Sequence, residues 1–198
     1  MTTRFVFFDR VVMAAALGVV VLALALIGDP VKQSLAWTRT GLEQGEWWRL
    51  ISGHWVHLGF FHAVLNASVL ILLTALFGEV FTLVRHGVHA LMGMLVIDAG
   101  LWWLGGIEWY VGLSGVLHTM AAAAVVRLII DRHDRLAWLV ALFGLSKIIY
   151  ENNFGAMPFS GSTDSVVTDA HLFGVLAGMI FGLVPDRNRK RRGVNDLA

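Results

Sequence analysis

Long runs of apolar residues constrain the fold of this chain more than any other feature. The first run, Val11–Ile27, contains no charged side chain, and five further runs are nearly uncharged. Charged residues make up only 15% of the 198-residue chain, whereas a soluble domain carries about 25%. We therefore expect an all-α membrane protein, a single domain over residues 1–198, with six spans near residues 11–27, 58–78, 88–104, 111–130, 136–150 and 166–185.

The first run is too long for the apolar part of a cleaved signal peptide. It follows Arg4 and Arg10, as a signal sequence would, but its 17 residues exceed the usual length of about 7–15. We interpret it as a retained membrane anchor.

The distribution of Lys and Arg predicts the orientation of the spans. If the N-terminus is cytoplasmic, the inner segments hold eleven basic residues: Arg4, Arg10, Arg85, Arg127, Arg132, Arg135, Arg187, Arg189, Lys190, Arg191 and Arg192. The outer segments hold four: Lys32, Arg39, Arg49 and Lys147. This bias predicts that both termini are cytoplasmic and that residues 186–198 form a basic cytoplasmic tail. We expect the tail to contact anionic lipid and not nucleic acid.

Polar residues lie inside three of the expected spans, where they are costly and need a reason. The second span carries His62 and Asn66, which share one helical face at i,i+4. The fourth span opens near Ser114, and the sixth carries His171. All three spans begin at the outer face in the predicted topology. At 1.5 Å of rise per residue their polar groups lie roughly 5–12 Å below the outer boundary, so the topology gathers them into one layer.

Small residues predict a close contact between the fourth and sixth spans. One face of the sixth span consists of His171, Gly174, Gly178 and Gly182. The face of the fourth span expected to meet it consists of Ser114, His118, Ala121, Ala122 and Val125. Such stripes let membrane helices approach closely. The approach would bring the serine hydroxyl within hydrogen-bond reach of the imidazole.

A serine and a histidine in this arrangement suit nucleophilic acyl transfer. A serine hydroxyl becomes a nucleophile when a base removes its proton, and neutral imidazole is the usual base near neutral pH. The transition state also needs donors for its oxyanion. The candidates are the Asn66 amide, His62 and the Ser114 backbone N–H, while Gly112 and Gly115 allow close approach of the backbone.

An acidic partner for the histidine is not evident in the sequence. Asp169 precedes His171 by two residues and projects from nearly the opposite side of the helix. We therefore predict a Ser114–His171 dyad and not a triad. This chemistry calls for no cofactor and no metal, and the absence of cysteine excludes a thiolate nucleophile and thiolate metal sites.

The remaining polar residues near the spans have structural interpretations. Asp98 lies in the middle of the third span, where a carboxyl group is expected to be protonated or paired. Lys147 is expected to extend to the outer interface, and Glu151–Ser165 is expected to form a loop. His54 and His57 lie near the interface, where we expect structural hydrogen bonds.

Three motifs resemble the signature of the rhomboid intramembrane proteases. Gly112-Leu113-Ser114-Gly115 resembles the family's GxSG, Ala170-His171-Leu172-Phe173-Gly174 its AHxxG, and His62-Ala63-Val64-Leu65-Asn66 its HxxxN. Trp48-Arg49 resembles the WR pair of the first outer loop, and His57 matches a histidine near the end of that loop. The motifs occur in the family's order, and the resemblance covers most of the chain.

The resemblance implies a six-helix rhomboid bundle with Ser114 and His171 as the catalytic dyad. It also implies that His62 and Asn66 line the oxyanion site. The substrates would be single-span membrane proteins that unwind near the outer leaflet and enter between the second and fifth helices. The expected location is a bacterial inner membrane, with a water-filled cavity open to the periplasm.

The supporting residues implied by the motifs are Gly112, Gly115, His118 and Gly174. At His118 the chain departs from the family's pattern, because many rhomboids have an aromatic residue there that packs beneath the catalytic histidine. This departure is expected to alter the substrate cavity or the basicity of the histidine.

Further segments resemble one subfamily, the rhombosortases. These segments are Gly45–Leu50 (GEWWRL), Ser114–His118 (SGVLH) and the pair Tyr150-Glu151. Rhombosortases are bacterial rhomboids thought to process a C-terminal signal of Gly-Gly, a transmembrane helix and a basic tail (GlyGly-CTERM). A general rhomboid protease with other substrates is the alternative.

Three other functions remain open at the level of sequence. His54, His57 and His62 could bind a metal in a membrane hydrolase, although the chain has no HExxH motif. Asp98 and the histidines could form the proton path of a transporter, although no repeat relates the two halves. A rhomboid-like pseudoprotease that only binds membrane clients is the third, although Ser114 and His171 are both present.

Overall fold

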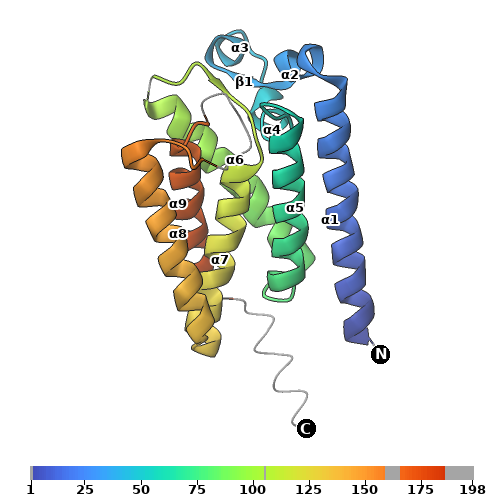
Figure 1. Cartoon of the computed structure of the whole chain (residues 1–198), viewed down its shortest axis with the longest axis vertical. Helices are drawn as coiled ribbons and strands as arrows, with labels where there is room; N and C mark the ends of the chain where they lie inside the picture. The colour runs from blue at the N-terminus through green and yellow to red at the C-terminus, as the bar shows by residue number, and fades with distance from the viewer. Residues whose placement is uncertain (1, 105, 159–165, 186–198) are drawn as a thin grey trace.

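The structure, a computed structural model, describes residues 2–104, 106–158 and 166–185 and is mainly helical, as predicted (Figure 1). The longer helices of this part of the chain are α1 (Thr2–Ile27), α5 (Phe60–Phe77), α6 (Leu83–Leu104), α7 (Ser114–Arg132), α8 (Arg135–Phe154) and α9 (Asp169–Leu183). The short elements are α2 (Asp29–Leu35), β1 (Trp37–Thr38), α3 (Arg39–Glu43), α4 (Arg49–Ser52) and β2 (Trp109–Tyr110).

Four helices of the described residues are long and apolar enough to cross a membrane. They are Phe8–Ile27 within α1, and α5, α6 and α7. The sequence predicted six spans, and the other two correspond to α8 and α9. α8 carries Lys147 and Glu151 in its second half, and α9 has only 15 residues. Lengths and compositions therefore support a multi-pass membrane protein.

The connection between α1 and α5 forms a folded layer at one end of the helices, where α2, β1, α3 and α4 lie together (Figure 1). β1 pairs antiparallel with β2, Trp37 opposite Tyr110. The buried Arg49 guanidinium holds the layer together, since its Nη1 donates to the carbonyl of Ala36 at 2.6 Å and its Nε to Glu46 Oε2 at 2.5 Å. Because β2 comes just before α7 in the chain, its pairing with β1 holds the segment that leads into α7 against this layer.

α9 packs against α7 through its glycines, as the sequence predicted. A Cβ on Gly174 would overlap the backbone of Gly115, and one on Gly178 would overlap the Thr119 carbonyl. The predicted contact face of α7 was right at Ala122, which a Cβ on Gly178 would also meet, and was otherwise wrong by about one residue. The glycine stripe meets Gly115, Thr119, Ala122, Ala123 and Val126. Ser114 and His118 lie beside this contact and line a cavity.

Helix ends differ from prediction at α6 and α8. α6 begins at Leu83, five residues before the predicted span. α8 begins after Asp134, whose side chain accepts hydrogen bonds from the backbone N–H of Leu136 and Ala137. It continues to Phe154, where Gly155 ends it at a φ of 83°. Glu151 therefore lies on a helix, and the prediction of a loop starting at this residue was wrong.

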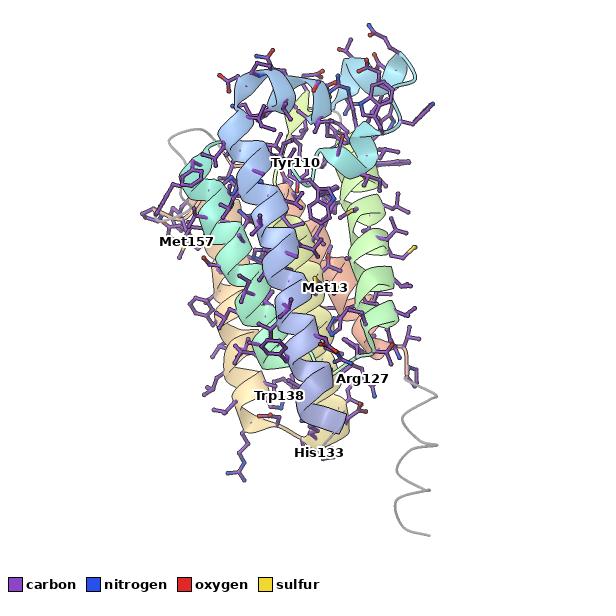
Figure 2. All side chains as sticks on the ribbon, turned by 90° about the vertical axis from the view of Figure 1, so that its right-hand side faces the viewer. Met13, Tyr110, Arg127, His133, Trp138 and Met157 are labelled. Atoms are coloured by element: carbon purple, nitrogen blue, oxygen red, sulfur yellow. The ribbon has the colours of Figure 1, made fainter. Side chains whose placement is uncertain are left out.

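The labelled residues show which parts of the chain lie at each end of the helices. Tyr110 and Met157 lie near the end that holds α2, α3 and α4, whereas Arg127 and His133 lie near the opposite end (Figure 2). Arg127 is buried and pairs with Asp131. The predicted basic tail, residues 186–198, lies outside the described residues.

Candidate active site

Ser114 is the first residue of α7, and the turn before it is tightly held. Gly112 has a φ of 124°, a conformation that favours glycine. The Gly112 N–H donates to the carbonyl of Gly53 at 3.0 Å, and its own carbonyl accepts from the Tyr110 hydroxyl at 2.6 Å. Leu113, not Ser114, occupies the N-cap position. The serine side chain is therefore available for contacts outside its own helix.

His171 lies in the first turn of α9 and faces this serine. Its Nε2 is 2.8 Å from Ser114 Oγ, across 57 positions of sequence. The close contact of Gly174 with Gly115 lies one helical turn below and sets the separation of the two helices. The structure thus brings together the two residues that the sequence predicted as nucleophile and base.

The second ring nitrogen of His171 has an acidic partner that the sequence prediction missed. His171 Nδ1 is 2.8 Å from Glu151 Oε2, and Lys147 Nζ is 2.7 Å from the same oxygen. The sequence analysis considered only Asp169, on the same helix as the histidine. Lys147 was expected at the outer interface but lines the cavity beside the histidine. The i,i+4 spacing of Lys147 and Glu151 was the available signal, and it has meaning only if α8 continues past Tyr150.

His118 lies beneath the ring of His171, at the position where the sequence departs from the pattern of the rhomboid motifs. Its ring stacks on that of His171, with centroids 4.4 Å apart and planes inclined by 19°. Its Nδ1 lies 2.7 Å from the carbonyl oxygen of Ser114, one turn earlier on α7. The imidazole of His118 therefore supplies the flat surface that a larger aromatic side chain would supply in the family's pattern.

A cavity of about 340 Å³ opens beside Ser114. Its polar lining comes from four helices: His62 and Asn66 on α5, Ser114 and His118 on α7, Lys147 and Glu151 on α8, and His171 on α9. The rest of the lining is apolar, including Leu65, Val69 and Phe143. The predicted layer of polar groups thus lines one cavity.

Asn66 and His62, both on α5, are buried and line the cavity. Asn66 Nδ2 donates to the carbonyl of His62 at 2.9 Å, which orients the amide along α5. Among the described residues, neither Asn66 Oδ1 nor His62 Nδ1 has a hydrogen-bond partner. An amide and an imidazole that face a reaction site can donate to an oxyanion.

Buried histidines of the folded layer brace the serine turn. His57 Nε2 accepts a hydrogen bond from the Leu113 N–H at 3.4 Å. Burial, and secondly the charge of His62, lower the pKa of His57 to about 3, so the ring is neutral and can accept. His54 Nε2 lies 3.2 Å from Asp98 Oδ1, and the Tyr110 hydroxyl lies 3.4 Å from His54 Nδ1. Asp98 is therefore paired, as expected.

The histidines do not form a metal site within the described residues, where no three His, Asp or Glu side chains gather in a metal-binding arrangement. His54 contacts Asp98 and Tyr110, while the His57 and His62 rings meet edge to face at 5.3 Å between centroids. The geometry gives no support to the metallohydrolase alternative.

Comparison with known proteins identifies a related domain. The rhomboid domain matches residues 44–186, which include each residue of the cavity described above. The chain is 33% identical over 148 residues to RHOMBOID-like protein 5 of Arabidopsis thaliana. The aligned region covers 72% of this chain and 45% of the plant protein, so the chain spans less than half the length of that relative.

Proposed function

This chain belongs to the rhomboid family, a family of intramembrane serine peptidases, and we propose that it is itself an intramembrane serine endopeptidase. Ser114 is the nucleophile and His171 is its base. The observation that carries this proposal is the 2.8 Å contact between Ser114 Oγ and His171 Nε2 at the edge of the cavity. A nucleophile and a base within hydrogen-bond reach are what acyl transfer requires.

The reaction proceeds through an acyl-enzyme. His171 Nε2 takes the proton of Ser114 Oγ while the oxygen bonds to the scissile carbonyl carbon. The tetrahedral intermediate then collapses, the C–N bond breaks, and the imidazolium returns the proton to the leaving amine. Water, activated by the same histidine, cleaves the ester.

The Asn66 amide and His62 stabilise the oxyanion of the intermediate. Replacing Asn66 with alanine is expected to lower kcat by about 10²- to 10³-fold with little change in KM, because the donor acts on charge that develops in the transition state. Steady-state cleavage of a single-span reporter in proteoliposomes measures both constants. Asn153→Ala, an exposed amide on α8, is the matched control. A rise in KM alone would assign Asn66 to substrate binding instead.

The topology follows from charge and from the position of the site. We place six spans in a bacterial inner membrane, with both termini cytoplasmic and the cavity open to the periplasm. The polar cavity lies toward the end that carries α2, α3 and α4, opposite Arg127 and His133 (Figure 2). Excess Arg and Lys on the other side supports a cytoplasmic assignment for that side. The short α9 begins beside the cavity, which Val166 and His171 line, and a helix that starts at a water-filled cavity need not cross the full bilayer.

The substrates are single-span membrane proteins whose helix unwinds near the outer leaflet. The cavity is lined by Leu65 and Val69 of α5 and by Phe143 of α8, which supports entry between these helices. The GEWWRL and SGVLH segments further favour a rhombosortase that recognises a C-terminal signal of Gly-Gly, an apolar helix and a basic tail.

A pair of reporters tests this specificity. One carries the Gly-Gly signal, an apolar helix and an Arg-rich tail, and its matched control has Val-Val in place of Gly-Gly. Co-expression with the full chain is expected to cleave the first reporter at least about tenfold faster, since glycine, which has no side chain, lets the substrate backbone approach the enzyme closely, whereas the branched valine side chains keep it away. Equal cleavage would favour a general rhomboid protease. The Ser114→Ala chain shows whether any cleavage comes from the host.

A further inference from the structure

Glu151 is a buried carboxylate that the reaction described above does not use. Its side chain is only 2% exposed, on α8 beside the cavity. Its Oε2 lies 2.8 Å from His171 Nδ1, while the other ring nitrogen, Nε2, faces Ser114 Oγ at the same distance. A buried charge is costly unless it is paired. Both partners of this carboxylate, His171 and Lys147, line the cavity.

We propose that Glu151 is a positioning residue that holds His171 in the tautomer required of the base and stabilises the imidazolium formed when Ser114 loses its proton. This inference rests on the proposed protease function. An ionised carboxylate can only accept hydrogen bonds, so the hydrogen of the neutral imidazole lies on Nδ1. The lone pair is then on Nε2, 2.8 Å from the hydroxyl whose proton it accepts.

Lys147 compensates the charge of this carboxylate. Its Nζ lies 2.7 Å from Glu151 Oε2 and also 3.4 Å from His171 Nδ1. An ammonium group and a ring N–H are both donors, so the second contact is not a hydrogen bond when Nδ1 is protonated. Both donors therefore converge on one carboxylate oxygen. The Lys147–Glu151 pair brings no net charge to the cavity and leaves the orientation of the ring to Glu151.

The position of Glu151 fits a role in orienting the His171 ring better than a role in stabilising α8 alone. An i,i+4 ion pair on one helix needs no third partner, and exposed pairs of this kind contribute little to stability. This pair is instead directed at a residue of another helix, and the carboxylate is its buried member. The His118 ring fixes the plane of His171 from below, and Glu151 fixes which edge of the ring faces Ser114.

Variants of the pair separate positioning from charge balance. Glu151→Gln is expected to slow fluorophosphonate labelling of Ser114 by about 10- to 100-fold, because a charge-assisted hydrogen bond to the base is lost. Glu79→Gln, an exposed carboxylate in the turn that follows α5, is expected to label at the wild-type rate. The double variant Lys147→Met/Glu151→Gln removes both charges. It stays as slow as Glu151→Gln if Glu151 positions the base, and recovery to the wild-type rate would overturn the inference.

A spectroscopic readout keeps this test independent of the protease assignment. Spectra of the full chain with ¹⁵N-labelled histidine, assigned with His171→Gln, are expected to show the Nδ1–H tautomer of His171 and its loss in Glu151→Gln. An unchanged tautomer together with unchanged labelling would contradict the inference and leave the protease proposal standing. If the wild-type chain shows a fixed Nδ1–H tautomer but is not labelled by the probe, the protease proposal is contradicted. The role of Glu151 in orienting the ring then still stands.

Discussion

Replacing Ser114 with alanine is expected to lower peptide-bond cleavage by at least about 10³-fold, because Ser114 carries the only hydroxyl among the described residues that line the cavity. His171→Ala is expected to cause a loss of similar size, since the hydroxyl then has no base at 2.8 Å. The double variant is expected to be no slower than either single variant, because residues that act as one unit have non-additive effects. Initial rates on a panel of single-span reporters in proteoliposomes measure all three.

The matched control for this prediction is Ser146→Ala, an exposed serine on α8 whose hydroxyl donates to the carbonyl of Phe143 in the same helix. This variant is expected to cleave at the wild-type rate. A Ser114→Ala chain that retained a tenth of the wild-type activity would contradict the assignment of the nucleophile. Chelator-sensitive residual activity in that chain would point back to a metal-dependent hydrolase.

Replacing Gly174 with alanine is expected to reduce both stability and activity. The new Cβ would overlap the carbonyl oxygen of Gly115, which is backbone and cannot move without shifting α7 or α9. Overpacking of this kind costs about 1–3 kcal/mol. A displacement of about 1 Å between Ser114 and His171 is expected to slow the reaction by about 10²-fold. Thermal unfolding in detergent measures the first effect, and fluorophosphonate labelling of the folded fraction measures the second.

Gly144→Ala is the matched control for the packing prediction. Gly144 lies on α8, where no atom approaches within 4 Å of the position of a new Cβ. Alanine there is expected to leave the unfolding temperature unchanged or to raise it slightly, because alanine favours the helix. If both variants behaved alike, the close contact of α7 with α9 would not be what holds the serine beside the histidine.

The site could be predicted from the sequence because polar groups in membrane spans are few and their depth can be counted. Because successive spans cross the membrane in opposite directions, the second, fourth and sixth spans all begin on the same side of the membrane. That is enough to bring Ser114, His171 and Asn66 to one layer, and the structure places all three around one cavity. The glycine stripe of α9 was likewise readable, because glycine at those positions leaves room for another backbone.

Two features could not be predicted, each for a physical reason. The face of α7 was partly misjudged because small residues lie on more than one side of this helix, with Gly115 and Ala123 next to Ser114 and Ala122, so composition does not fix its rotation. Glu151 was missed because a run of polar residues after Tyr150 resembles a loop. Only the folded chain shows that α8 continues to Phe154 and carries the carboxylate to His171.

Covalent labelling of the purified full chain by a fluorophosphonate probe, with the modified residue identified by mass spectrometry, tests the central claim most directly. The wild-type chain is expected to carry the label on Ser114, and both Ser114→Ala and His171→Ala are expected to remain unlabelled while retaining the wild-type helical content. Label on another residue, or label that persists in Ser114→Ala, would contradict the claim that this serine, activated by His171, is the nucleophile.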